Sequence, residues 1–434
     1  LERRRFFMQN SMFDKEWFRL DNAAKIYPAA RSNRWNNVFR MSVVLKEEVK
    51  PDVLQQALED VIDRFPSFRV TLKKGFFWYY FQFVTSKPKI QEEKSFPCTM
   101  MRLKGKGYIF RVLYHSHRIS VEVFHSITDG TGNITFLKTL VARYCELCGA
   151  KIADYGDVLH YDDDPTLEEV EDSFARYVDK SKGTIARNEP SAYQIKGQRE
   201  KRGVLNVTQG SMPFEQLHKV AKSYGCTINT YLSSVIAYVY LRRQLYENKS
   251  KKKPVKIQIP INLRKIFPSV TMRNFAGFFN TSLSPEEQTF EEVCKEMNRQ
   301  IKDFVTPEYC QKFINSNVSL EQVPLIRIAP RFLKTFFMNI SFRAVGERLM
   351  SICLSNVGNV VMPKELDDYI DRFEFLIGPQ KFIDHAMTAI SFNGTTLVSF
   401  TRTIKNSTVE RDFFKVLVEH GIDVTINTNR GYDV

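Results

Sequence analysis

The spacing of apolar positions predicts helices alternating with strands in the first part of the chain. Residues 51–62 place apolar side chains at helical spacing behind a proline, which predicts a helix. Aromatic and β-branched side chains dominate residues 68–72 and 76–84, which predicts two strands. Two more strands are expected at 108–114 and 119–124, separated by a short polar segment typical of a hairpin turn. These elements predict a sheet with flanking helices.

The last of these strands ends at a histidine, His125. The segment Gly130-Thr131-Gly132 predicts a flexible turn, and apolar positions at helical spacing return from Asn133 onward. His125 is therefore expected between the end of a strand and the start of a helix, where functional side chains are common.

The second half repeats this mixture after an acidic and polar stretch. We expect residues 1–150 to form an N-terminal lobe, 151–202 to connect the lobes, and 203–434 to form a C-terminal lobe. The strands expected in the second half are 203–208, 255–261, 348–354, 372–377, 386–392 and 395–401, and the helices are 213–224, 230–246 and 409–420. The fold class predicted is α/β, with two lobes that each hold a mixed β-sheet and flanking helices.

Composition narrows the class of protein. With 434 residues, of which 43% are hydrophobic and 13% aromatic, the chain can bury a sizeable core. No apolar run reaches the roughly 18 residues that cross a bilayer, so we expect no membrane span. The basic N-terminus lacks the long apolar stretch of a secretory signal. Seven scattered cysteines suit reduced thiols, and we expect a cytoplasmic location.

Basic residues outnumber acidic ones by 63 to 49, which gives a formal net charge of +14. Such a surface favours anions, including the phosphates of CoA, acidic carrier proteins, nucleic acid and anionic lipid. The chain has no zinc-finger spacing, no aromatic RNA-binding motif and no basic region joined to heptads, so we expect no nucleic-acid partner.

The strand-to-helix junction carries the best candidate chemistry. Histidine can act as base and acid near neutral pH, and Asp129 follows four residues after His125. On residue types alone, a histidine capping a backbone group beside an aspartate in a turn is the more common meaning of such a pattern.

The segment Phe124-His125-Ser126-Ile127-Thr128-Asp129-Gly130 resembles the His-His-x-x-x-Asp-Gly motif of the CoA-dependent acyltransferase superfamily. That superfamily includes chloramphenicol acetyltransferase, the alcohol acyltransferases and the condensation domains of nonribosomal peptide synthetases. Two further stretches, 259–264 with 273–277 and 354–360, resemble its second-half strand and its Ser-Asn-x-Gly strand. Similarity is greatest to the bacterial alcohol acetyltransferase and condensation-domain-like branch, also in Phe392-Asn393-Gly394 and in Phe413-Phe414, and it covers about residues 17–426.

The resemblance implies a mechanism and roles for particular residues. His125 would be the general base, while Asp129 and Gly130 would be structural, with Arg264 as the partner of Asp129. Ser355 and Asn356 would help bind the substrate, in an active-site tunnel between the lobes, and hydrogen bonding at the end of a strand is an equally good interpretation of these two residues. The first histidine of the motif is Phe124 here, which changes the shape and polarity expected around the base.

Other patterns predict little chemistry. His115, His117 and His125 could imitate a metal site with Asp129, but the first two bracket a hairpin turn, and we expect no metal. Ser126 lacks the Gly-x-Ser-x-Gly context of a hydrolase. Cys145 and Cys148 form a lone Cys-x-x-Cys, for which buried thiols are favoured.

A basic stretch includes Lys249, Lys251, Lys252, Lys253 and Lys256. A solvated loop is the usual meaning of such a run. The alternative is that Lys252 and Lys253 bind the phosphates of CoA or an acidic carrier protein.

Three functions stay open at this point. The first is an acyltransferase that moves an acyl group from acyl-CoA, a co-substrate rather than a bound cofactor, to a small alcohol or amine. The second takes the acyl group from phosphopantetheine on an acyl carrier protein. The third is a non-catalytic binding protein that keeps the fold.

Overall fold

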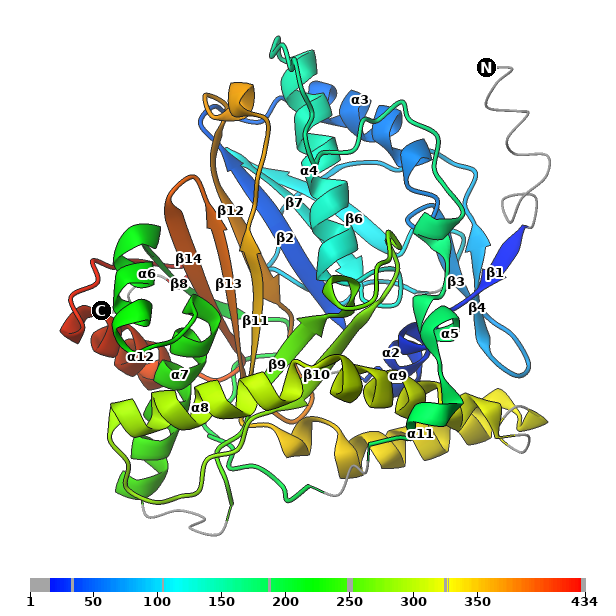
Figure 1. Ribbon diagram of the computed structural model, residues 1–434. Helices are drawn as coiled ribbons and strands as arrows, with labels where there is room; N and C mark the ends of the chain where they lie inside the picture. Colours follow the sequence, from blue (N-terminus) through cyan, green and yellow to red (C-terminus); the bar gives the residue numbers. More distant parts are fainter. Residues whose placement is uncertain are drawn as a thin grey trace.

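A computed structural model describes residues 16–430 except 33–34, 104, 186–188, 248–252, 324–325 and 327. Three sheets, surrounded by helices, make up the fold (Figure 1). The two larger sheets lie in the two lobes, and each buries its own hydrophobic cluster. The chain is therefore a mixed α/β protein with two lobes, as the sequence predicts.

The sheet of the first lobe has five strands in the order β12-β2-β7-β6-β5. Its strands are β2 (Val38–Leu45), β5 (Gln91–Glu92), β6 (Phe110–His115), β7 (Arg118–Phe124) and β12 (Ile370–Ile377). Helices α3 (Pro51–Val61) and α4 (Gly130–Leu147) pack against each other, and α4 packs on β2 and β7. Apolar side chains on the facing sides of these elements form the first core.

The β12 strand belongs to the second half of the sequence but pairs antiparallel with β2 over its whole length. This strand also contacts the second lobe. Thr401 Oγ1, which belongs to that lobe, donates a hydrogen bond to the Ile377 carbonyl oxygen at 2.7 Å. One strand therefore ties the two sheets together. The lobe boundary at residue 203 stays a prediction. Because β12 follows that boundary in the sequence but lies in the sheet of the first lobe, the first lobe is not one continuous segment.

The sheet of the second lobe has seven strands in the order β10-β9-β11-β13-β14-β8-β15. They are β8 (Asn206–Pro213), β9 (Ile257–Asn262), β10 (Ala276–Asn280), β11 (Ile352–Asn359), β13 (His385–Phe392), β14 (Thr395–Arg402) and β15 (Thr425–Thr428). Helices α6 (Phe214–Ser223), α7 (Ile228–Tyr246), α8 (Phe290–Phe304) and α12 (Thr408–Glu419) pack buried side chains into the second core.

The remaining elements lie along one side of the molecule (Figure 1). A small sheet holds β1 (Trp17–Arg19), β4 (Tyr79–Phe83) and β3 (Val70–Lys74) in that order. Beside it are the short helix α2 (Ile26–Ala30) and the longer helices α9 (Pro307–Gln322) and α11 (Arg331–Val345), of which α11 packs on α2. Within its described residues, the connection between the lobes contains the short helix α5 (Ser173–Tyr177), 3-10 turns and an isolated bridge from Arg199 to Ile404.

Two local predictions are wrong for physical reasons. The expected flexible turn at residues 130–132 is the first turn of α4, because the Asp129 side chain accepts hydrogen bonds from the Thr131 and Gly132 amides and caps the helix. The expected strand at residues 76–84 begins only at Tyr79, because Phe76 and Phe77 are exposed at the β3–β4 turn. Among the described residues, no helix is both long and apolar enough to cross a membrane.

Candidate active site

His125 follows the last residue of β7 and is partly buried. Its backbone N–H donates to the Asn37 carbonyl at 2.9 Å, and Asn37 has a left-handed φ of 55°. Asparagine tolerates this conformation better than most residues. The junction between β7 and α4 is thereby fixed by the residue that precedes β2.

The ring of His125 is held on three sides. Tyr27 of α2 stacks on it, with ring centroids 4.3 Å apart and an angle of 15° between the planes. Phe39 lies tilted against it at 4.8 Å. The Nδ1 atom lies 3.1 Å from Asn274 Oδ1, which comes from the second half of the chain. Both lobes therefore orient the imidazole.

The Asn274 contact selects one tautomer of the histidine. The Asn274 amide nitrogen donates to Asp21 Oδ2 at 3.3 Å and to the Ser126 carbonyl at 3.4 Å, so its oxygen faces the imidazole. An oxygen can only accept, so Nδ1 of His125 carries the proton in the neutral ring. The Nε2 atom is then the unprotonated nitrogen, which is the form that a general base needs.

Asp21 stands behind Asn274 and is fully buried. It accepts hydrogen bonds from the Asn274 side chain and the Ala24 amide, and it lies 3.4 Å from the Arg273 guanidinium. Burial raises the pKa of Asp21 to about 6, and the positive charge of Arg273 opposes that rise. Asp21, Asn274 and His125 form a chain in which each side chain orients the next.

Burial also lowers the pKa of His125 below its ordinary value of 6.5. Desolvation disfavours the charged imidazolium. The backbone of His125, Asp129 and Asn274 favour the charged form, but their combined effect is smaller. The ring is therefore neutral at pH 7 and able to accept a proton.

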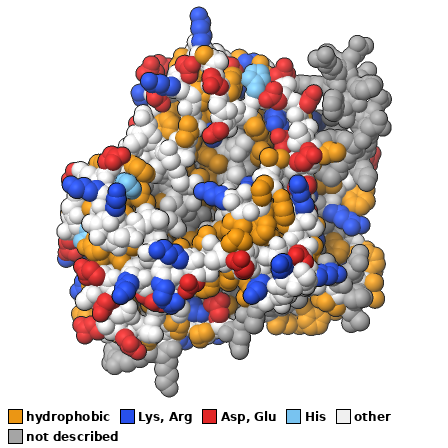
Figure 2. Space-filling view, in the orientation of Figure 1, with side chains coloured by type: hydrophobic (Ala, Val, Ile, Leu, Met, Phe, Trp, Pro, Cys, Tyr) orange, Lys and Arg blue, Asp and Glu red, His pale blue; other side chains and the backbone are white. Residues whose placement is uncertain are grey.

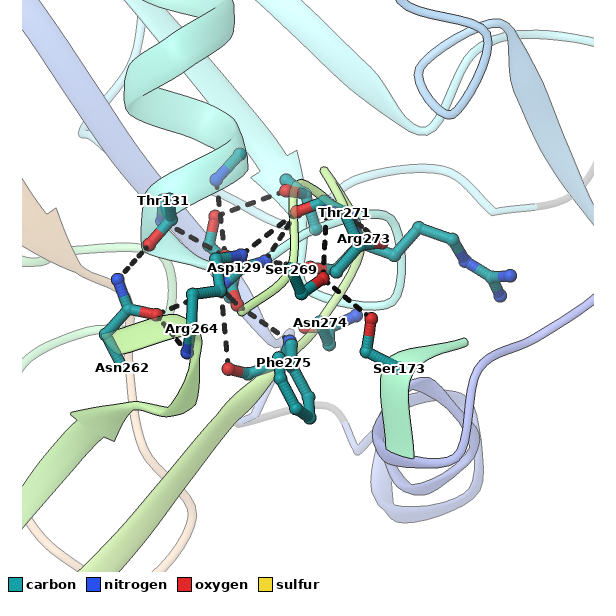
Figure 3. Close-up of polar contacts among 12 residues, drawn as sticks. Asp129, Thr131, Ser173, Asn262, Arg264, Ser269, Thr271, Arg273, Asn274 and Phe275 are labelled. Carbon is teal, nitrogen blue, oxygen red and sulfur yellow. Dashed lines mark hydrogen bonds and ion pairs between the residues drawn. The ribbon is translucent and has the colours of Figure 1, made fainter. Parts of the chain in front are cut away.

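Asp129 joins the two lobes through its carboxylate (Figure 3). One carboxylate oxygen accepts from the Thr131 and Gly132 amides at the start of α4. The other accepts from the Phe275 amide and from Arg264, each at 2.8 Å. Both oxygens of the carboxylate are thus engaged in contacts that hold the structure together, and the structural role of Asp129 stays a prediction.

Arg264 is the ion-pair partner that the sequence resemblance implied for Asp129. Its guanidinium also donates to the carbonyls of Thr271, at 3.0 and 2.8 Å, and of Arg273, at 2.6 Å (Figure 3). The arginine therefore folds the segment after β9 back over the start of α4. The amide of Asn262 extends this contact by donating to Thr131 Oγ1 at 3.2 Å.

The approach of the two segments is too close for a side chain at Gly132. A Cβ atom built there meets Thr128 Oγ1 and the Met272 carbonyl oxygen at distances that real structures do not show. Thr128 Oγ1 itself donates to that carbonyl at 2.5 Å. Gly130 has more space, since a Cβ there meets only Met41 at 3.5 Å. Gly132 rather than Gly130 is therefore the glycine that this junction requires.

Phe124 occupies the place of the first motif histidine and is fully buried in the core of the first lobe. A phenylalanine in place of the motif histidine therefore adds an apolar side chain to this core.

Two other predicted site residues lie on a strand of the second lobe. Ser355 and Asn356 are half-buried in β11, where they pair with Thr388 and Ala389 of β13, and Asn356 accepts from the Gly358 amide. No contact of either residue with His125 is seen in the part of the chain that the structure describes. Their role in substrate binding stays a prediction.

The lysines of the basic stretch differ in their exposure and in their partners. Lys249, Lys251 and Lys252 lie outside the described residues, and Lys253 is exposed. Lys256 is buried and forms an ion pair with Glu189 at 2.8 Å, so its charge is already compensated. Phosphate binding by Lys252 and Lys253 stays a prediction.

All seven cysteines are free thiols, including Cys145 and Cys148. Across the described ranges, no group of three or more His, Cys, Asp or Glu side chains is arranged to hold a metal ion. His117 is engaged in the hairpin turn with Ser116, 2.8 Å from its Oγ.

The surface is hollowed near the middle of the face shown in Figure 2, over β11. A groove of about 910 Å³ lies elsewhere, between α12 and β15, and none of the predicted site residues lines it. A tunnel that reaches His125 from two sides stays a prediction.

Comparison with known proteins locates the fold. No family model matches the chain, and no curated protein matches its sequence. Among solved structures, polyketide synthase associated protein 5 from Mycobacterium tuberculosis is 13% identical, with a TM-score of 0.61 over 92% of this chain and 96% of that one. The first condensation domain of the calcium-dependent antibiotic synthetase is 12% identical, with a TM-score of 0.60 over 93% and 96%.

A trichothecene 15-O-acetyltransferase from Fusarium sporotrichioides is 9% identical, with a TM-score of 0.59 over 92% of this chain and 93% of that one. These likenesses extend over both lobes. The chain therefore has the two-lobed fold of condensation domains and chloramphenicol-acetyltransferase-like proteins, as the sequence motifs implied. At these identities, the likeness is one of fold.

Proposed function

We propose that this protein is an acyltransferase that moves an acyl group from a CoA thioester to a hydroxyl or amine, with His125 Nε2 as the general base. The observation that carries the proposal is the contact between His125 Nδ1 and Asn274 Oδ1, because it leaves Nε2 as the proton acceptor. The lowered pKa of His125 supports it, since a base must be unprotonated at working pH.

The proposed reaction needs no covalent enzyme intermediate. The acceptor oxygen or nitrogen attacks the thioester carbonyl carbon while its proton passes to Nε2. The C–S bond then breaks, and the departing thiolate takes the proton back from the imidazolium. Positioned general-base catalysis is worth about 10²–10⁴ in rate, and holding donor and acceptor together supplies the rest.

The experiment is a thiol-release assay with a panel of acyl-CoA donors and alcohol or amine acceptors. Acceptor-dependent release of thiol from at least one acyl-CoA supports the proposal. Release only from acyl groups carried on phosphopantetheine of a carrier protein would favour the second donor class, which the likeness to condensation domains keeps open. Turnover with neither donor class would leave only a non-catalytic role.

A further inference from the structure

One face of α11 displays large apolar side chains to solvent. Phe332, Phe336 and Phe337 are 68%, 61% and 62% exposed, and Leu333 and Ile340 are exposed beside them. Their spacing places all five on one side of the helix. We call these five residues the α11 face. In Figure 2, apolar side chains gather at the lower right, where α11 lies in Figure 1.

The β3–β4 turn extends this face with Phe76 and Phe77, which are 72% and 46% exposed. The turn is fixed to the start of α11, because the Arg331 amide donates to the Phe76 carbonyl at 2.9 Å. The Lys334 ammonium donates to the Phe77 carbonyl at 3.1 Å and lies over the Trp78 ring at 3.8 Å. Two separate segments therefore hold their phenylalanines on one continuous surface.

The size of this surface is unusual for a soluble monomer. A phenylalanine side chain offers about 200 Å², so Phe76, Phe332, Phe336 and Phe337 together expose on the order of 500 Å². Monomers rarely expose contiguous apolar patches larger than a few hundred Å² unless the patch binds something.

The two chain segments that form this surface carry basic and no acidic residues. Residues 67–90, which include the β3–β4 turn, contain five Lys or Arg and no Asp or Glu. Residues 323–346, which include α11, contain four Lys or Arg and no Asp or Glu. A second copy of the chain would bring the same positive segments against themselves, which is unfavourable. An anionic partner is favoured.

We propose that the α11 face and the β3–β4 turn dock on the surface of an anionic lipid bilayer. Phenylalanine and leucine side chains on one side of a helix, in segments that contain cations and no acids, suit the boundary between headgroups and acyl chains. The docked helix would lie next to the active site, because α11 packs on α2 and α2 carries Tyr27, which stacks on His125. The proposal is independent of the acyl donor.

The test is co-sedimentation of the full-length protein with vesicles of about three parts phosphatidylcholine to one part phosphatidylglycerol, and with phosphatidylcholine alone. We expect at least about tenfold tighter binding to the anionic vesicles, and weaker binding as salt is raised. The triple variant Phe332→Ser, Phe336→Ser and Phe337→Ser should lose at least about tenfold in affinity.

A matched control replaces two exposed apolar residues elsewhere, Tyr246 and Val418, which are 91% and 56% exposed, by serine. The control should bind as the wild type does, and both variants should keep the wild-type melting temperature. Equal binding by the triple variant would overturn the proposal. So would a wild-type dimer in lipid-free solution that the triple variant converts to monomer, or binding to an acidic carrier protein with none to vesicles.

Discussion

Replacing Asp129 with alanine tests the contact that joins the two lobes. The substitution removes the cap from the Thr131 and Gly132 amides of α4. It also removes the acceptor for the Phe275 amide and the ion-pair partner of Arg264. Because the carboxylate and the guanidinium are only 5% and 9% exposed, water does not replace the lost partner easily.

The size of the effect follows from these contacts. Loss of a helix cap costs about 1 kcal/mol. Breaking a buried ion pair by removing one partner costs about 3–5 kcal/mol, because the other charge is left uncompensated. The carbonyls of Thr271 and Arg273 keep part of the guanidinium satisfied. We therefore expect Asp129→Ala to lower the free energy of unfolding by about 3–4 kcal/mol.

Urea unfolding followed by circular dichroism measures this change, with Arg264→Ala and the double variant completing the cycle. We expect a coupling energy of about 2 kcal/mol or more between Asp129 and Arg264. Where Asp129→Ala is folded, its kcat should stay within about tenfold of the wild type, since the residue is not proposed to handle protons. A loss of stability below about 1 kcal/mol, or no coupling, would refute this reasoning.

Three further predictions concern the same junction. Asn274→Leu removes the acceptor at His125 Nδ1 and should lower kcat at least about tenfold, whereas Asn274→Asp should retain more activity. Equal kcat for the wild type and both variants would count against the selection of one tautomer by Asn274. The acid limb of the kcat/KM profile should have its midpoint below pH 6.5, because burial lowers the pKa of His125. The free energy of unfolding should also fall as the pH drops below 6.5, because the unfolded chain binds the proton at a higher pH than the folded chain does. A midpoint at or above 6.5 would contradict that burial. Gly132→Ala should cost about 2 kcal/mol or more in urea unfolding through its clash with Thr128 and the Met272 carbonyl, and an unchanged midpoint would show that the junction gives way.

Local patterns in the sequence are enough to place His125. An alternating strand, a short turn and a helical repeat are neighbours in the chain, so β7, His125 and α4 are predictable. The exact start of α4 is not, because the intrinsic preference of Gly130 and Gly132 for turns is outweighed by the Asp129 cap. Helix α8 begins at a capping box of Thr289 and Glu292, a pattern that is visible in the sequence.

The partners of His125 are less accessible to sequence reasoning. Asp21 and Tyr27 lie about a hundred residues before the histidine, and neither belongs to a pattern that marks it for a site. Asn274 stood out only through the resemblance to a family motif, and its contact with the ring depends on how the lobes pack. The pairing of β12 is equally hard to predict. Its sequence clearly indicates a strand, but its partner β2 lies far away in the chain.

The central claim is that His125 is the base, and the most direct measurement is kcat of His125→Ala with a donor and acceptor pair that the wild type turns over. His117→Ala, a change in the exposed hairpin turn, is the matched control. We predict a loss of at least about 10²-fold for His125→Ala at pH 7, an unchanged melting temperature, and wild-type kcat for the control. A folded His125→Ala variant that turns over as fast as the wild type would contradict the claim.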